Sequence, residues 1–218
     1  MSLTNIKEVV LVNSSIVGEA LFVLRESAKI TFDNCIFQDN VLIHYSLRQA
    51  MLPSTILKIM KSLFIGQMDI FIFNLGNELN EYIYKKENIA KIDTNCTNIQ
   101  LFNNRFLKQS TIFTENVNVV IKRNVFRVED IKIIGTIVRP EAVIIIDNTF
   151  EENKQVKFAS DEYLDDVKGV DKADVLFDIL AKKSASKVVE GNKYIVNYVK
   201  LNKYVQNSLF LRKFLRYN

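Results

Sequence analysis

The chain has 218 residues and a formal net charge of +4, and 48% of its residues are hydrophobic while 25% are charged. This composition is too apolar for a disordered protein, and the length allows one substantial core. No apolar run is long enough for a transmembrane helix or, at the start of the chain, for a secretory signal, so the sequence predicts neither and leaves the localisation open.

A short pattern recurs along much of the chain. Each copy has apolar residues two apart, then polar residues, then one apolar anchor. The copies are VVLVNSSIV (9–17), KITFDNCIF (29–37), ILKIMKSLF (56–64), NIQLFNNRF (98–106), NVVIKRNVF (118–126) and AVIIIDNTF (142–150). A spacing of two is that of strands, and a unit this small cannot bury its own apolar face. The pattern therefore predicts stacked coils of short strands.

The anchors of these copies should stack on one another inside the coils. They are Val17, Phe37, Phe64, Phe106, Phe126 and Phe150. Their separations are 20, 27, 42, 20 and 24 residues, and the separation of 42 predicts a hidden coil near residues 81–89.

Small polar or amide residues recur two positions before each anchor. They are Ser15, Cys35, Ser62, Asn104, Asn124 and Asn148. Equivalent amide side chains in successive coils can hydrogen-bond to one another, so we predict a structural ladder at the bends, formed above all by Asn104, Asn124 and Asn148. Asn also tolerates left-handed backbone at bends, which accounts for the 22 Asn of the chain.

The segments ITFDNCIF, IQLFNNRF, VVIKRNVF and IIIDNTF resemble the coils of right-handed parallel β-helix proteins, the pectin-lyase-like superfamily. The resemblance covers residues 9–158 and implies three parallel sheets around an apolar core. We therefore predict an all-β solenoid, a right-handed parallel β-helix of about six to seven coils, in residues 1–159.

Residues 160–218 are predicted to form a mainly helical C-terminal cap or arm. DKADVLFDILAKK (171–183) has helical spacing and Asp171 as a candidate N-cap, residues 192–205 fit a helix or a strand, and residues 208–218 fit a short helix. The outward residues Val120, Ile144 and Ile146 would form an apolar outer face. We expect this segment or a partner chain to cover them.

The charge is uneven at the C-terminal end, because residues 151–178 sum to −5 and residues 187–218 to +6. The basic end could pair with the acidic segment or lie in solvent. Alternatively it could bind an anionic partner. The candidate binding residues for such a partner are Lys193, Lys200, Lys203, Arg212, Lys213 and Arg216.

Proteins of the superfamily that the repeats resemble often bind or cleave polysaccharides with charged residues clustered on an outer sheet face. Here Asp33 stands alone in the outward columns of the repeated strand, so this strand lacks the paired carboxylates that such cleavage needs, and a site on another sheet stays an open alternative. His44 is the only histidine, Cys35 and Cys96 are predicted to be packed or bend thiols, and no phosphate-binding loop occurs. The sequence predicts no catalytic residue, no metal site and no cofactor.

Three functions follow as hypotheses. The first is a non-catalytic solenoid that serves as a structural or binding module in a larger assembly, similar to the rigid β-helices of viral and phage attachment proteins. The second is a carbohydrate-binding or polysaccharide-cleaving protein, and the third is a nucleic-acid or ribonucleoprotein component that uses the basic end. The expected partners are proteins or further copies of the chain, with polysaccharide second and nucleic acid third.

Overall fold

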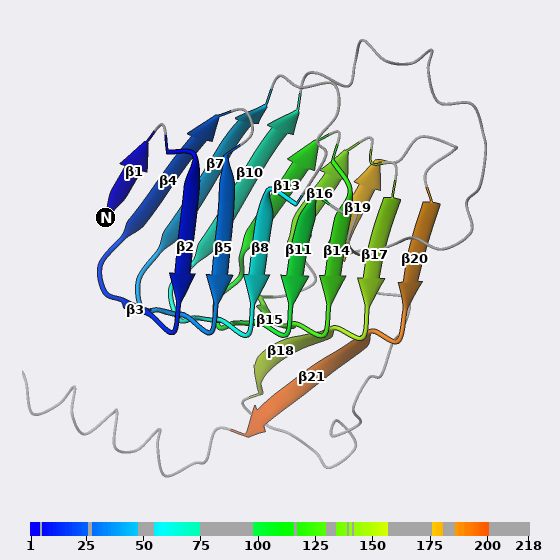
Figure 1. The fold of residues 1–218 in the computed structure, drawn as a ribbon. Helices are drawn as coiled ribbons and strands as arrows, with labels where there is room; N and C mark the ends of the chain where they lie inside the picture. The colour runs from blue at the N-terminus through cyan, green and yellow to red at the C-terminus, as the bar shows by residue number, and fades with distance from the viewer. Residues whose placement is uncertain are drawn as a thin grey trace, which may run out of the picture.

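The computed structural model describes residues 1–4, 6–25, 28–47, 55–74, 98–115, 117–129, 134–138, 140, 142–156, 176–180 and 186–200. In this part of the chain, three parallel sheets of seven strands each wind around one core (Figure 1). Each coil contributes one strand to sheet A, then one to sheet B and one to sheet C. The predicted all-β solenoid is confirmed, with seven coils.

Sheet A contains β1 (Ser2–Thr4), β4 (Ala20–Arg25), β7 (Val41–Leu47), β10 (Met68–Asn74), β13 (Thr111–Glu115), β16 (Gly135–Val138) and β19 (Phe177–Leu180). Sheet B contains β2 (Glu8–Val12), β5 (Lys29–Asp33), β8 (Leu57–Met60), β11 (Ile99–Phe102), β14 (Val119–Lys122), β17 (Ala142–Ile146) and β20 (Ser186–Glu190). Sheet C contains β3 (Ser15–Ile16), β6 (Ile36–Phe37), β9 (Leu63–Phe64), β12 (Arg105–Phe106), β15 (Val125–Val128), β18 (Thr149–Val156) and β21 (Lys193–Lys200).

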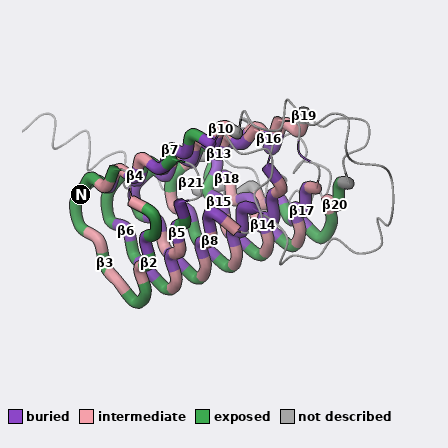
Figure 2. Tube along the Cα trace, turned by 45° about the horizontal axis from the view of Figure 1, so that its top comes forward, coloured by how far each residue is buried: buried purple, intermediate pink, exposed green. Residues whose placement is uncertain are grey.

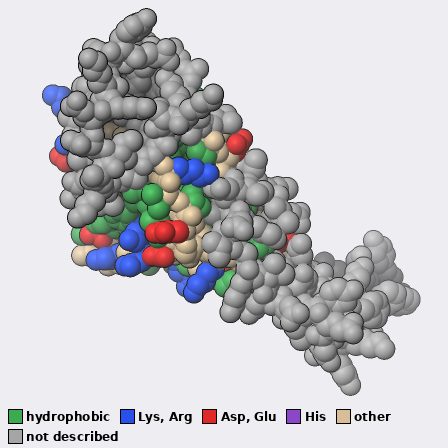
Figure 3. All heavy atoms as spheres, turned by 90° about the vertical axis from the view of Figure 1, so that its right-hand side faces the viewer, with side chains coloured by type: hydrophobic (Ala, Val, Ile, Leu, Met, Phe, Trp, Pro, Cys, Tyr) green, Lys and Arg blue, Asp and Glu red, His purple; other side chains and the backbone are tan. Residues whose placement is uncertain are grey.

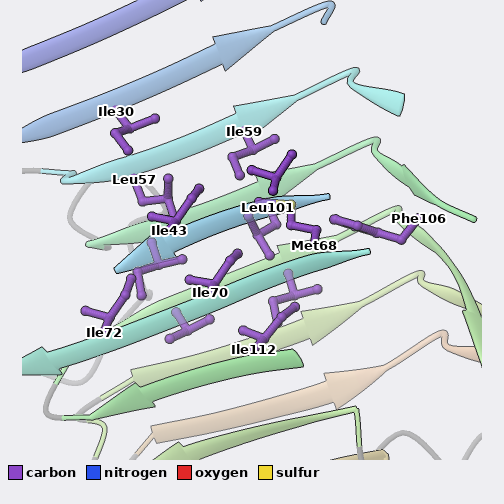
Figure 4. Packing of buried hydrophobic residues seen from close by; sticks show 14 of the residues in the cluster. Ile30, Ile43, Leu57, Ile59, Met68, Ile70, Ile72, Leu101, Phe106 and Ile112 are labelled. Carbon is purple, nitrogen blue, oxygen red and sulfur yellow. The ribbon is translucent and has the colours of Figure 1, made fainter. Parts of the chain in front are cut away.

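The core lies between the three sheets and is built from alternate residues of each strand. Ile30, Leu57 and Leu101 of sheet B face Ile43 and neighbouring aliphatic side chains of sheet A across the interior (Figure 4). In β4, β7 and β13 of sheet A, buried residues alternate with half-buried or exposed ones, and Figure 2 shows the buried residues gathered in the middle coils. The period of two that predicts strands therefore also selects the residues that are buried.

The predicted anchors form a column of stacked rings in sheet C. The ring centroids are 4.8 Å apart for Phe37 and Phe64, 5.1 Å for Phe64 and Phe106, 4.7 Å for Phe106 and Phe126, and 5.5 Å for Phe126 and Phe150. Each of these rings is about 1% exposed. Tyr194 of β21 continues the column after Phe150.

The corner between sheet B and sheet C is the same in all seven coils, because two residues separate the strands each time. The first corner residue has a positive φ of 50–65° in every coil, and these residues are Asn13, Asn34, Lys61, Asn103, Arg123, Asp147 and Gly191. Asn and Gly suit this left-handed conformation, whereas Lys61 and Arg123 adopt it at a cost in conformational energy.

The second corner residue carries the ladder. Asn104, Asn124, Asn148 and Asn192 are nearly fully buried, and each amide Nδ2 of the first three donates to the Oδ1 of the next residue at 3.0–3.1 Å. The same Oδ1 atoms accept the backbone N–H of the preceding ladder residue at 2.9–3.0 Å. Ser62 and Cys35 continue the ladder toward the first coil, because the Cys35 N–H donates to Ser62 Oγ at 3.1 Å.

Two details of the predicted register are wrong. Ile16, not Val17, pairs with Phe37, and Val17 is 71% exposed. The first corner begins one residue earlier than the alignment assumed, so Ser14 takes the place given to Ser15. Phe64 pairs directly with Phe106, so no coil lies between them, and the hidden coil predicted near residues 81–89 does not exist. Those residues lie outside the described part, inside an insertion between β10 and β11.

The helical prediction for residues 171–183 is also wrong where the structure describes them, because Phe177–Leu180 forms β19 and pairs in parallel with β16. The alternating Phe177 and Ile179 point to the core, where Phe177 lies against Gly135. Lys193–Lys200 forms a strand, which resolves the alternatives for residues 192–205 in that part. The boundary predicted at residues 159 and 160 and the helix predicted for 208–218 lie outside the described residues.

Candidate functional site

The outward side of sheet B changes from exposed to buried along the solenoid. One outward column consists of Val10, Thr31, Lys58, Gln100, Val120, Ile144 and Val188. Val10 is 54% exposed, but Gln100 is 6% and Val120 0% exposed. This outward column is therefore closed to a ligand at Gln100, Val120 and Ile144.

The apolar outer face predicted at Val120, Ile144 and Ile146 is largely buried in the chain itself. Val120 is 0% and Ile144 6% exposed although neither belongs to the core cluster inside the solenoid, and Ile146 is half-buried. As predicted from the alternation, the two buried residues point outward. The segment expected to cover them, residues 160–218, is described only at 176–180 and 186–200.

Asp33 and Glu152 are two described acidic residues that could serve a catalytic site. Asp33 has Val12 and Met60 as its neighbours in the outward column. Glu152 is 1% exposed, and its Oε2 accepts a hydrogen bond from the buried Tyr194 hydroxyl. Within the described ranges, no three His, Cys, Asp or Glu side chains lie close enough together to hold a metal ion.

The predicted basic site is described only at its start. Lys193 is exposed on sheet C, and Lys200 ends β21. Lys203, Arg212, Lys213 and Arg216 lie outside the described residues. A nucleic-acid interface of these side chains stays a prediction, and salt-dependent retention on heparin or RNA would test it.

Two reactive side chains are part of the core. Burial raises the pKa of the Tyr45 hydroxyl, which donates a hydrogen bond to the Ile56 carbonyl at 2.9 Å. Cys35 is buried in the corner ladder, and its thiol lies 3.3 Å from the Leu11 carbonyl oxygen. Both groups have a structural partner and no access to solvent, so neither offers a nucleophile.

The outward side of sheet A carries an aromatic cluster that the sequence analysis missed. One outward column runs through Val23, His44, Phe71, Phe113, Thr136 and Asp178. Phe73 belongs to the neighbouring outward column, beside Ser46 and Glu115. We call His44, Phe71, Phe73 and Phe113 the aromatic face.

Within the aromatic face, the Phe73 ring contacts both His44 and Phe113. The ring centroids of Phe73 and Phe113 are 5.1 Å apart, and those of His44 and Phe73 are 5.8 Å apart with an edge-on geometry. His44 is exposed, the three phenylalanines are half-buried, and Leu42 beside them is 38% exposed. Polar side chains, among them Asp69 and Thr111, lie in the adjoining column.

A sequence signal for this face existed. In MDIFIFN (68–74), apolar residues occur at both even-numbered and odd-numbered positions. Successive residues of a strand point to opposite sides, so one of these two sets faces the core and the other faces outward. Ile70 and Ile72 are buried in the core, which leaves Phe71 and Phe73 outside. The uninterrupted apolar run, rather than any single residue, marks the surface.

Comparisons with protein-family models, with curated proteins and with solved structures found no match to this chain. None of the helices in the described residues is long and apolar enough to span a membrane. The functional argument therefore rests on the geometry of the solenoid and its outer faces.

Proposed function

We propose that the chain is a right-handed parallel β-helix that acts as a non-catalytic structural or binding module in a larger assembly. Crossover connections between parallel strands of one sheet are right-handed in about 98% of cases, which supports this hand. The observation that carries the functional proposal is the aromatic face, a set of aromatic side chains held outward on a stack of paired strands.

A stacked solenoid suits the role of a binding module. Its strands are paired on both sides in the middle coils, so the positions of Phe71 and Phe113 are fixed by β10 and β13 before any partner binds. Such preorganisation lowers the entropy cost of association. Aromatic side chains are enriched at protein interfaces because they bury much area with few rotatable bonds.

The mass of the native particle tests this function. We expect the full-length protein, purified from its natural source, to travel in a particle much heavier than one chain. Phe71→Ser together with Phe113→Ser should return it to the mass of the free chain or of a small oligomer of it. Ile65→Ser, at a side chain that is 40% exposed elsewhere on the solenoid, should leave the particle intact. A native particle unaffected by the paired change would contradict the proposal.

A carbohydrate-binding module is the second candidate, and the polar neighbours of the rings favour it. Sugars stack on aromatic rings and hydrogen-bond to side chains beside them, and Asp69, Thr111 and Thr136 lie next to the aromatic face. Affinity electrophoresis against a panel of neutral and acidic polysaccharides, without added metal, distinguishes the two. Retardation that the paired Phe71 and Phe113 change abolishes would support the carbohydrate function.

A further inference from the structure

The first coil leaves the apolar end of the solenoid open. Its inward side chains Leu3, Ile6, Leu11 and Ile16 pack against the core but are only partly buried. Figure 2 shows the first coil mostly in the colours of exposed and intermediate residues, in contrast to the middle coils. Among the described residues, no strand pairs with the outer edges of β1, β2 and β3. The backbone groups along those edges can therefore accept another strand.

β2 is apolar on both of its sides from Val9 to Val12, after the exposed Glu8 that begins the strand. Val9 and Leu11 point to the core, while Val10 and Val12 point outward and are 54% and 49% exposed. The next coil has the polar residues Thr31 and Asp33 in the outward columns. A strand that is apolar on both sides is typical of the interior of a sheet, whereas end strands are normally protected by charge or proline. β2 has the sequence of a strand with a partner on each edge.

The opposite end of the solenoid cannot supply that partner. The inward column that begins at Val9 and passes through Val119 and Val143 ends at Lys187 of β20. Lys187 is exposed at this end, and stacking the first coil of another copy onto it would move a charged side chain out of water, which is costly. Figure 3, viewed from the β20 side, shows basic and acidic side chains around the hydrophobic ones on this end. A head-to-tail filament is therefore disfavoured.

One register of β2 against the β2 strand of a second copy satisfies both the backbone and the side chains. The Lys7 carbonyl accepts from the Lys29 N–H, and the Asn13 N–H donates to the Asp33 carbonyl. Odd-numbered residues of β2 thus bond to β5, and the N–H and C=O groups of the even-numbered residues point to the open edge. An antiparallel pair centred on Val10 aligns these groups in both copies.

We propose that two copies of the chain associate head to head through the first coil, with β2 paired antiparallel to β2 about Val10. In this register Val10 lies opposite Val10 of the second copy on the outer side, and Val9 lies opposite Leu11 on the core side. The two cores become continuous, and the exposed valines become cross-strand neighbours. The contact uses the same surface on both copies, so it closes as a dimer and does not propagate.

The charges of the first coil permit this contact. The first coil carries Lys7, Glu8 and Glu19, so charges of both signs lie on the facing ends. The register places Glu8 beside Val12 of the second copy, and no pair of like charges lies directly opposite. This proposal is independent of the aromatic face, which lies on sheet A in later coils.

Analytical ultracentrifugation of the full chain tests the proposal. We expect twice the mass of one chain at micromolar concentration and no larger species. Val10→Lys, which places two ammonium groups opposite each other, should weaken association by more than about tenfold. The side chain is outward and exposed, so the circular dichroism spectrum should be unchanged. Ile65→Lys, at a comparably exposed residue away from the end, should still dimerise. A monomer, a mass that grows with concentration, or a dimeric Val10→Lys variant would overturn the proposal.

Cross-linking tests the register independently of affinity. In a Cys96→Ser background, Val10→Cys should form an interchain disulfide under mild oxidation, because opposed residues of an antiparallel pair lie about 5.5 Å apart at Cα. Val12→Cys is the matched control on the same side of β2. Its counterpart in the second copy lies about 13 Å away along the strands, so it should not cross-link. Equal yields from the two variants, or none from Val10→Cys, would contradict the register.

Discussion

The corner between sheet B and sheet C has the same length in every coil, whereas the corners that lead into and out of sheet A do not. Two residues separate β14 from β15 and β11 from β12 alike, but residues 75–98 separate β10 from β11 and residues 116–118 separate β13 from β14. Despite this variation, β11 pairs with β8 and β14 in register. The fold is therefore specified by a compact unit of one sheet B strand, the corner and one sheet C strand, and the remaining corners tolerate insertions.

The regular corner is constrained because it holds three features together. It has a left-handed residue, a buried amide that bonds to the coils on either side, and an aromatic ring that follows within the next strand. An insertion here would displace the ladder and the ring column at once, leaving buried donors unpaired. At the other corners an insertion only lengthens a loop, which costs little free energy.

The largest expected effect is at the ring column. Phe126 is 1% exposed and lies between Phe106 and Phe150, so Phe126→Ala should lower the free energy of unfolding by about 3–5 kcal/mol through the cavity that it leaves. Phe113→Ala removes a half-buried ring on the outer side of sheet A and should cost about 1 kcal/mol. Urea unfolding of the two variants measures both. Equal losses would show that the column beside the corner has no special role in stability.

The buried amide should have the next largest effect. Asn124→Ala removes the acceptor of the Asn104 N–H at 2.9 Å and should cost about 1–3 kcal/mol, because that donor is left buried without its partner. Asn118 is the matched residue at the corner between sheets A and B, where its Oδ1 accepts the Ala142 N–H. Asn118 is half-buried, so water can replace the amide, and Asn118→Ala should cost less than about 1 kcal/mol. The same unfolding measurement compares the two, and a larger loss for Asn118→Ala would reverse the ranking of the corners.

The regular unit is the part of the fold that sequence reasoning could predict. The alternation of apolar residues indicates the strands. The residues at a fixed distance before Phe106, Phe126 and Phe150 indicate the corner, and these phenylalanines themselves indicate the ring column. The variable corners carry no such pattern. For that reason the sequence predicts a hidden coil near residues 81–89, where the structure has an insertion after β10. The segment that forms β19 predicts a helix because VLFDIL fits both periodicities, and only its pairing with β16 decides between them.

The aromatic face could be predicted only by knowing whether the even-numbered or the odd-numbered residues of MDIFIFN (68–74) face the core. This choice is set by the register of β10 with β7 and β13, a long-range feature that no local window contains. The open first coil has a similar origin. Val10 and Val12 look like core residues in sequence, and only the corner at Asn13 places them outside.

A polar residue in the core of sheet A offers a stabilising change. Thr114 is 0% exposed on the inward side of β13, beside Ile72 and Ile137, and its Oγ1 has no hydrogen-bond partner among the described residues. Thr114→Val keeps the shape and removes the unpaired hydroxyl, so it should raise the free energy of unfolding by about 1 kcal/mol. Thr111→Val, exposed on the same strand, should change it by less than about 0.5 kcal/mol. Thermal and urea unfolding measure the change. If Thr114→Val is less stable than the unchanged protein, the Thr114 hydroxyl has a hydrogen-bond partner in solution and the prediction is wrong.

The smallest effect concerns the left-handed residue of the regular corner. Arg123 has φ of 56° where Asn13, Asn34 and Asn103 occupy the same place in other coils. Asn adopts this backbone conformation with less strain than Arg, so Arg123→Asn should stabilise the chain by about 0.5 kcal/mol. The ion pair that is lost, 3.6 Å from Arg123 Nε to Asp147 Oδ2, joins side chains that are 63% and 44% exposed. Water screens such a pair, so its loss costs little.

The Asn at residue 123 would also lie beside Asn103, in the arrangement that joins Asn34 Nδ2 to Asn13 Oδ1 at 2.7 Å. Arg105→Asn is the control, because Arg105 is exposed in β12 and pairs there with Leu63 and Val125 in ordinary strand conformation. Asn is unfavourable in strands, so this control should be slightly destabilised. In differential scanning calorimetry, the melting temperature of Arg123→Asn should therefore rise and that of Arg105→Asn should fall. A parallel decrease would mean that the left-handed corner stores no strain at Arg123, and that its regular length is fixed by the ladder and the rings alone.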